Sequence, residues 1–223
     1  MPRFAHRCVA SHCLLCGAAC RSNLCRPCAA SLPRLAEERC RICATPLESG
    51  TTCGACLERK PHFDSVTAAH PFVFPIDALV RNYKYAGNLA LAPLLANRIA
   101  RVVCGHVDAI VPMPLAPERL RERGFNQAHE LARHVARALQ LPVLPSACRK
   151  VTETPPQAAL PWDERARNVR GAFVCDIELT GKRIAIVDDV MTTGATLNEL
   201  SRNLKRAGAA SVCGWVLART LKD

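Results

Sequence analysis

The sequence predicts an α/β protein with a twisted, mainly parallel sheet flanked by helices, preceded by a small cysteine-rich module. Two observations lead to this prediction. Short aliphatic runs typical of buried strands alternate with segments of helical spacing through most of the chain. Ten of the fourteen cysteines, in contrast, lie within the first 56 residues. We therefore expect two units, a module over residues 1–60 and an α/β domain over residues 61–223.

Composition limits the class of protein. Hydrophobic residues make up 49% of the 223 residues and aromatic residues only 4%, so we expect an aliphatic core. No apolar run approaches the roughly 18 residues of a membrane-spanning helix, and we expect no membrane insertion. Residues 1–7 lead into cysteines rather than into an apolar secretory segment, which indicates a cytoplasmic protein. Because reducing compartments do not sustain disulfide frameworks, so many cysteines point to metal.

Eight of the early cysteines form four C-x-x-C pairs, and each pair suits two thiolates converging on one tetrahedral Zn2+. We interpret them as two sequential zinc ribbons with two structural Zn2+ sites. A cross-braced arrangement, in which the first and third pairs share a zinc, stays open, and a redox role would leave three pairs unexplained. The expected ligands are Cys13, Cys16, Cys25 and Cys28 in one site and Cys40, Cys43, Cys53 and Cys56 in the other.

Several cysteines and histidines lie outside the four pairs, and the chain is basic. Cys8, Cys20, His12, His62 and His70 are expected to be loop or surface residues rather than ligands. The formal net charge is +11, and eight zinc-bound thiolates with two Zn2+ lower it to about +7. The arginines of the module suit a nucleic-acid surface or, alternatively, a solvated surface. No aromatic interleaving supports base stacking there.

The α/β domain begins beyond Pro61. Residues 66–74 are expected to form an edge strand or hairpin, because Pro71 lacks a donor for a central strand. Residues 76–85 and 89–103 have helical spacing, separated by Gly87 and Asn88. Residues 108–111 form the next core strand candidate, and residues 128–139 the next amphipathic helix.

Prolines and arginines follow the strand at 108–111. Prolines fix an unusual loop shape, and guanidinium groups bind phosphate oxygens in pairs, so the segment suits a pyrophosphate site. Alternatively, Arg119 and Arg123 pair with Glu118 and Glu122 on an exposed helix. The phosphate site predicted further along favours the first interpretation. The candidates are Val111, Pro112, Met113, Pro114, Arg119, Arg121 and Arg123.

The most informative segment is the strand near residue 184 and the turn that follows it. Four apolar residues at 184–187 predict a strand buried on both faces, which stops at Asp188 and Asp189. A hydroxyl-rich turn with Gly194 follows, and then a helix whose apolar positions recur at helical spacing. Open α/β sheets bind ligands at this carboxyl edge.

The turn predicts a phosphate site. Gly194 has no side chain to block an anion that approaches the backbone, and the N-terminus of the following helix favours negative charge. Adjacent carboxylates accept hydrogen bonds from a vicinal diol, so the whole predicts a ribose 5-phosphate site. No Walker A or G-x-G-x-x-G motif is present, although a plain strand–turn–helix with capping threonines is an alternative. The phosphate candidates are Thr192, Thr193, Gly194, Ala195 and Thr196.

This segment resembles the ribose-phosphate motif of type I phosphoribosyltransferases, and the whole chain is similar to the ComF/GntX-like family. That family joins a double zinc ribbon to a phosphoribosyltransferase domain. The matching blocks are the four C-x-x-C pairs, L-V-R-N-Y-K-Y-A-G at 79–87, V-P-M-P at 111–114, R-E-R-G-F-N-Q at 121–127, T-P-P-Q at 154–157, R-N-V-R-G-A-F at 167–173 and D-D…T-T-G-x-T at 188–196.

The resemblance implies binding of phosphoribosyl pyrophosphate (PRPP) with Mg2+, and pentosyl transfer to an acceptor that the sequence does not name. It assigns Asp188 and Asp189 to the two ribose hydroxyls as catalytic residues. Residues 149–173 would form a flap, with Gln157, Arg165, Arg167 and Asn168 either serving the ligand or tying the loop down. The resemblance further implies a role in DNA uptake, with single-stranded DNA and a second copy of the chain as candidate partners. A non-catalytic PRPP sensor that binds single-stranded DNA is the alternative.

Overall fold

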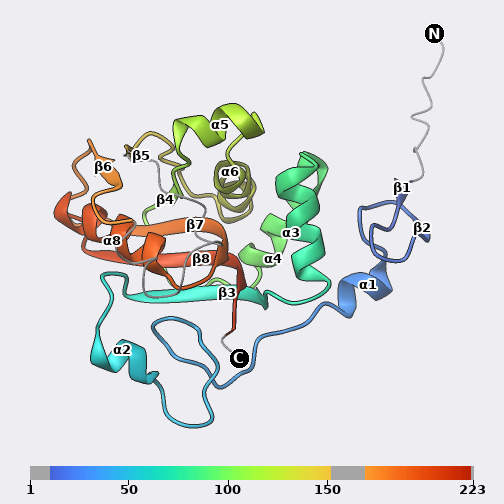
Figure 1. Cartoon of the computed structure of the whole chain (residues 1–223), viewed down its shortest axis with the longest axis horizontal. Coiled ribbons are helices and arrows are strands. Elements are labelled where there is room, and N and C mark those ends of the chain that lie inside the picture. The colour runs from blue at the N-terminus through green and yellow to red at the C-terminus, as the bar shows by residue number, and fades with distance from the viewer. Residues whose placement is uncertain (1–10, 152–168, 222–223) are drawn as a thin grey trace.

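The computed structural model describes residues 11–151 and 169–221, and its centre is a four-stranded, all-parallel sheet (Figure 1). The strand order is β3-β8-β7-β4, so the prediction of a mainly parallel sheet is confirmed. Pro71 ends β3, which is the edge strand predicted from that proline, and β3 is parallel to β8 rather than part of a hairpin. The strands are β3 (Ser65–Pro71), β4 (Ala109–Pro112), β7 (Arg183–Met191) and β8 (Ser211–Arg219).

Strand β7 is longer than the sequence predicts. It does not stop at the two acids but continues to Met191, paired with β8 along its whole length. Asp188 lies opposite Val216, and Met191 lies opposite Arg219. The expectation that the strand ends at the acids is therefore wrong, because pairing with β8 overrides the low strand preference of aspartate.

Helices cover both faces of the sheet. Alternation along β7 sends Ile184 and Ile186 to the face covered by α8, whereas Ala185 and Val187 pack with the helices of the other face. The predicted helix at 89–103 is divided into a short 3₁₀ turn and a helix. The helices of the domain within the described residues are α3 (Ile76–Tyr85), η1 (Leu89–Leu91), α4 (Ala92–Ala100), α5 (Pro117–Arg123), α6 (Gln127–Leu139) and α8 (Ala195–Arg206).

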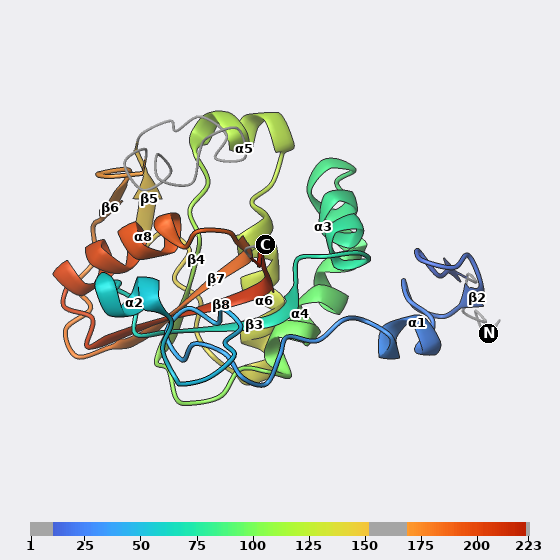
Figure 2. The same cartoon turned by 60° about the horizontal axis from the view of Figure 1, so that its bottom comes forward.

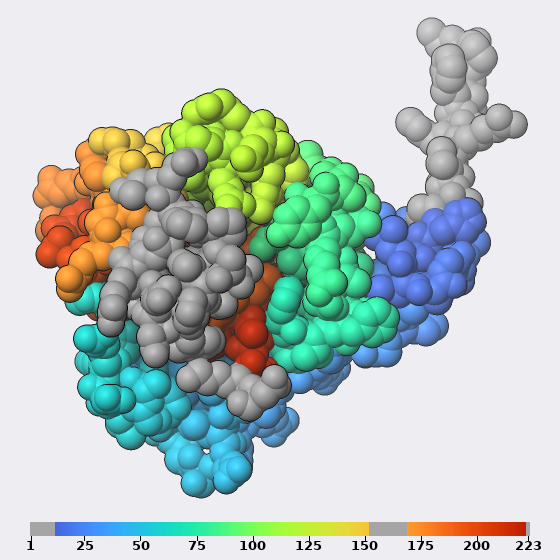
Figure 3. All heavy atoms as spheres, in the orientation of Figure 1, coloured from blue at the N-terminus to red at the C-terminus, as the bar shows by residue number. Residues whose placement is uncertain are grey.

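The two cysteine ribbons pack on opposite faces of this sheet. Cys13 shares a buried cluster with α3 and α4, whereas Cys40, Cys43 and Cys56 share one with α8 and β7. Figures 1 and 2 both show the first ribbon beside α4 and the second against β3, and in Figure 3 the first projects from the body. The ribbon elements are β1 (Ser11–His12), β2 (Ala19–Cys20), α1 (Arg26–Ala30) and α2 (Gly54–Glu58).

A separate antiparallel pair lies beside α8. Strands β5 (Cys148–Lys150) and β6 (Phe173–Cys175) place Cys148 directly opposite Cys175, and the two form a disulfide that the sequence did not lead us to expect. Both ends of the proposed flap, residues 149–150 and 173, belong to this pair. Within the described residues, the structure contains no helix that is both long and apolar enough to cross a membrane.

Candidate functional site

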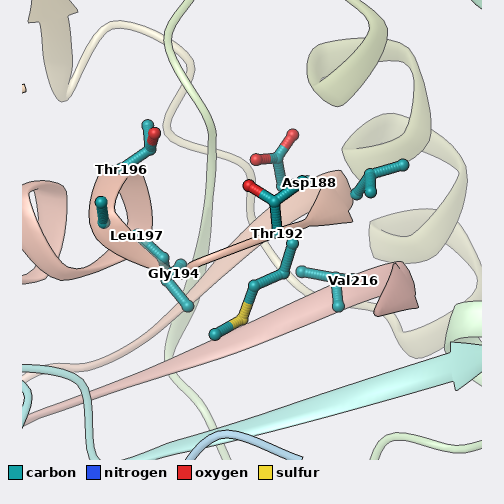
Figure 4. Close-up of a pocket in the computed structure, with 9 residues that line it drawn as sticks. Asp188, Thr192, Gly194, Thr196, Leu197 and Val216 are labelled. Atoms are coloured by element: carbon teal, nitrogen blue, oxygen red, sulfur yellow. The ribbon is translucent and has the colours of Figure 1, made fainter. Parts of the chain in front are cut away.

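A pocket opens at the carboxyl end of β7, where the sequence predicts the phosphate site. Figure 4 shows the Asp188 carboxylate and Thr192 beside the turn at Gly194, with Thr196 on the first turn of α8. Residues of β7, the turn, α8 and β8 thus contribute to one hollow. It is lined by Asp188, Val190, Met191, Thr192, Gly194, Ala195, Thr196, Leu197 and Val216.

The turn has the backbone geometry that the motif predicts. Gly194 has a φ of +83°, a conformation that costs an L-residue strain, and α8 begins directly after it. The Thr193 hydroxyl accepts a hydrogen bond from the Ala195 N–H at 3.1 Å, the first backbone donor of the helix. No acidic residue lies in the first turn of α8. The positive end of the helix dipole therefore faces the pocket without a carboxylate of its own helix.

The two acids of the motif face opposite sides of the sheet. Because they are neighbours within β7, their side chains alternate. Asp188 lines the pocket on the α8 side, whereas Asp189 is only 6% exposed and binds Lys84 of α3, with 2.8 Å between Nζ and Oδ2. We call residues 192–196 the phosphate turn. The structure brings Asp188, but not the carboxylate of Asp189, to this turn.

These surroundings shift the pKa of Asp188 and that of Lys84. Burial and the neighbouring charge of Asp189 raise the pKa of Asp188 to about 8, against the opposing effect of Lys84. Burial by itself would lower the pKa of Lys84, but the Asp189 carboxylate outweighs it and the net pKa rises. The site therefore holds a lysine cation next to one buried carboxylate and a second carboxyl group that retains its proton easily.

The predicted pyrophosphate residues lie on β4 and α5. Val111, Pro112 and Met113 are buried at the end of β4. The arginine-rich run forms helix α5, as the alternative interpretation of an exposed helix expects, but the glutamate pair is made by Arg121, with Glu118 at 2.9 Å, rather than by Arg119 or Arg123. The Arg123 guanidinium lies over the Tyr85 ring, 5.4 Å from its centroid. None of these arginines is among the residues that line the pocket in the described structure.

The eight predicted zinc ligands form two sets of four, and each set combines two consecutive C-x-x-C pairs. This is the sequential arrangement, and the cross-braced alternative is excluded. Within each set all four Sγ atoms lie within 4.8 Å of one another. Tetrahedral Zn–S bonds of about 2.3 Å place sulfur atoms about 3.8 Å apart. Sγ of Cys16 lies 3.6 Å from that of Cys25, and Sγ of Cys43 lies 3.5 Å from that of Cys53. Both sets therefore fit Zn2+ without rearrangement.

Among the residues that the structure describes, His12, His62, His70 and Cys20 are not part of either set, as expected. The expectation of a loop or surface position is wrong for His70, which is buried within strand β3. Burial lowers its pKa, and its Nδ1 contacts the Pro33 carbonyl at 2.6 Å. Cys20 Sγ contacts the Ser22 carbonyl at 2.6 Å. Cys8 and the flap candidates Gln157, Arg165, Arg167 and Asn168 lie outside the described residues.

Two residues near the pocket carry no role in the sequence-based prediction. Lys84 lies within the family block at 79–87, but no sequence feature indicates that it pairs with Asp189, which lies 105 positions further along the chain. Arg219 is 5% exposed and donates hydrogen bonds to the carbonyl oxygens of Met191 and Thr192, which enter the phosphate turn. The sequence feature that could have identified Arg219 is its position as a charged residue directly after the apolar run 215–218.

Comparisons with known proteins agree with this two-part organisation. Residues 6–57 match the family described as double zinc ribbon domain. Residues 123–222 match the family described as phosphoribosyl transferase domain.

Individual proteins are similar over most of the chain. The chain is 33% identical to Competence protein F of Haemophilus influenzae over 192 residues, which cover 81% of this chain and 84% of that protein. It is 32% identical to DNA utilization protein YhgH of Escherichia coli over 191 residues, or 82% of this chain and 84% of that one. Glutamine PRPP amidotransferase from B. subtilis is a structural neighbour with 21% identity and a TM-score of 0.40, over 56% of this chain and 26% of its own.

Proposed function

The chain belongs to the ComF-like family, in which a double zinc ribbon is joined to a phosphoribosyltransferase domain, and on this premise we propose that it binds PRPP with Mg2+ at the carboxyl end of β7. The observation that carries the proposal is the common pocket of Asp188 and the Gly194 turn. A carboxyl group whose oxygen atoms accept hydrogen bonds from hydroxyl groups stands beside a helix start that favours an anion. That combination suits ribose 5-phosphate.

Each group has a defined part in the proposal. The 5-phosphate lies against the backbone from Thr192 to Thr196, and Asp188 accepts hydrogen bonds from the ribose hydroxyls. Asp189, paired with Lys84 on the opposite face of the sheet, holds the end of β7 in place, so that Asp188 keeps its position beside the ribose. The oxygen donors of the pocket suit Mg2+, which would neutralise pyrophosphate charge. Positioning and charge stabilisation therefore provide the catalysis, and the acceptor attacks C1 as the C1–O bond to pyrophosphate breaks.

Isothermal titration of the zinc-loaded protein with PRPP and Mg2+, beside ribose 5-phosphate, tests the proposal. Binding of both ligands is expected. The double variant Asp188→Asn/Asp189→Asn should bind PRPP at least tenfold more weakly with its zinc content intact. Asp176→Asn is the control, because Asp176 is an exposed acid paired with Arg149 far from the pocket turn. Unchanged affinity in the double variant would sink the assignment.

A second candidate function is a non-catalytic protein that senses PRPP and binds single-stranded DNA. The observation in its favour is the basic ribbon surface, where Arg21, Arg26, Arg39, Arg41 and Arg59 are exposed. The names of the relatives refer to competence and to DNA utilization. Pyrophosphate release in the presence of an acceptor supports the enzyme. DNA binding without release, weakening steeply as salt rises, supports the second candidate.

A further inference from the structure

The guanidinium of Arg219 lies between the second cysteine cluster and the phosphate turn. Arg219 ends β8 and is 5% exposed, so its charge is held inside the protein. Within the described residues, its guanidinium donates hydrogen bonds to two neutral oxygen atoms of the cysteine ribbon and to three of the chain around the turn.

On the ribbon side, Arg219 contacts the cluster through Cys43 and Thr45. Its Nε donates to the Cys43 carbonyl at 3.0 Å, and its Nη2 donates to the Thr45 hydroxyl at 3.2 Å. The same hydroxyl lies 3.2 Å from Cys43 Sγ. Because a metal-bound thiolate carries no proton, this hydroxyl then donates to the sulfur and accepts from the guanidinium. The second metal position is thus two hydrogen bonds from Arg219.

On the pocket side, Arg219 fixes the start of the turn. Its Nη1 donates to the carbonyl oxygens of Met191, at 3.3 Å, and Thr192. It also donates to the Thr220 carbonyl at 2.6 Å, and the Thr220 N–H donates to the Met191 carbonyl at 3.0 Å. With both entering carbonyls fixed, the direction of the chain into Thr193 and Gly194 is set.

The charge balance links these two sides. A buried guanidinium is costly unless an opposite charge lies close by. Four thiolates with one Zn2+ carry a net charge of about −2. The metal-loaded cluster is therefore a counter-charge for Arg219 that zinc holds in place.

The first cluster has no comparable link in the described structure. It lies on the other face of the sheet, and its neighbours bind η1 and α4: Asn23 donates to the Ala90 carbonyl at 2.6 Å, and Arg98 donates to the Ala29 carbonyl at 2.9 Å. Two metal sites of the same ligand type therefore differ in their connection to the pocket.

We propose that Arg219 is a positioning residue through which zinc in the second cluster, but not in the first, holds the phosphate turn in its ligand-binding form. This inference rests on the proposed function, since it concerns ligand affinity at that turn. Loss of the second zinc releases the Cys43–Thr45 anchor, and the counter-charge is then no longer held in a fixed position. Coupling between two sites commonly changes affinity by about 5–150-fold, and we expect about tenfold here.

Two matched variants test the inference directly. Cys25→Ser and Cys53→Ser each remove one partly buried ligand from the first and the second cluster. Atomic emission should report one zinc per chain for each variant. Titration with ribose 5-phosphate should give a Kd about tenfold weaker for Cys53→Ser and within twofold of the unmodified protein for Cys25→Ser. Equal affinities of the two variants would overturn the proposal.

A milder variant separates positioning from folding. Thr45→Val keeps the side-chain volume and all eight ligands, so two zinc ions should remain bound while affinity for ribose 5-phosphate falls severalfold. Arg219→Lys should retain more affinity than Arg219→Met, because only lysine keeps the charge. Full affinity in zinc-replete Thr45→Val and Arg219→Met would contradict the proposal.

Hydrogen exchange distinguishes failure of this inference from failure of the proposed function. If the unmodified protein binds neither PRPP nor ribose 5-phosphate, the proposed function fails. The link is then read from the amides of residues 190–196, which should exchange faster in Cys53→Ser than in Cys25→Ser. Equal exchange in the two variants overturns the link whatever the ligand.

Discussion

Lys84 Nζ lies 2.8 Å from Asp189 Oδ2, and this ion pair joins the end of α3 to the end of β7. The side chains of Lys84 and Asp189 are 20% and 8% exposed. The pair occupies the side of the sheet opposite to the pocket, so Asp189 is held in place before any ligand arrives. The two acids of one motif therefore have different surroundings and different tasks.

Removing Lys84 should destabilise the fold. Lys84→Met leaves a buried carboxylate without its cation, and we expect a loss of about 3 kcal/mol in the free energy of unfolding. The control is Lys205→Met, because Lys205 and Asp64 form a more exposed pair, and such pairs contribute at most about 1 kcal/mol. Urea unfolding measures both, and equal losses would contradict the role of burial. The double variant Lys84→Met/Asp189→Asn should lose less than the two single variants combined.

The raised pKa of Asp188 predicts a pH dependence of stability. The unfolded chain releases this proton near pH 4, but the folded chain keeps it up to a pKa of about 8. The folded state therefore binds more protons in between, and stability falls as pH rises through this window. Asp188→Asn removes this dependence, so its stability advantage over the unmodified protein should grow from pH 5.5 to pH 8.5. A difference that stays constant across these two pH values, measured by urea unfolding, would refute the assignment.

Gly194 should be required for the turn. Gly194→Ala forces alanine to a φ of +83° and brings its Cβ within 2.6 Å of the mobile Met191 Cε, so we expect a loss of about 1–2 kcal/mol in stability and a tenfold weaker Kd for PRPP. Gly181→Ala is the matched control, with a φ of +72° and open space around it. It should cost similar stability and leave the Kd unchanged. Similar binding losses in both variants would mean that the turn has no special role.

Zinc should leave the two clusters at different rates. Cys16 of the first cluster is exposed, whereas Cys40 and Cys43 of the second are 1% and 7% exposed. A chromogenic chelator should therefore remove zinc in a fast and a slow phase of equal size. Cys25→Ser should abolish the fast phase and Cys53→Ser the slow one. A single phase in the unmodified protein would argue against different protection.

Local patterns predicted much of the fold because they follow from local physics. The aliphatic run at 184–187 and the proline at position 71 predict a buried strand and an edge strand, and both are confirmed. The helix at 117–123 appears only as an alternative interpretation of the basic run. Pro117 in its first turn and Gly124 in the left-handed conformation at its end are the sequence features that predict this helix. The arginines between them suit a phosphate-binding loop equally well.

Contacts between distant positions could not be predicted in this way. Lys84 with Asp189, and Arg219 with Cys43, depend on how α3 and the second ribbon pack on the sheet, which no local pattern encodes. The disulfide between Cys148 and Cys175 was missed because the compartment argument assigns cysteines to metal. Their separation of 27 residues gives no local signal of pairing.

The central position of β8 affects how the protein is made. Strands β3 and β7 emerge from the ribosome first, yet both need β8 as their neighbour. Asp64 and Val212, which meet at the start of the β3–β8 pair, are 148 positions apart, or about 7–30 s of translation. Until then the nascent chain carries two open strand edges, which attract other chains. Slow synthesis should therefore favour chaperone capture or aggregation of this protein, and the pocket is completed only when Arg219 arrives.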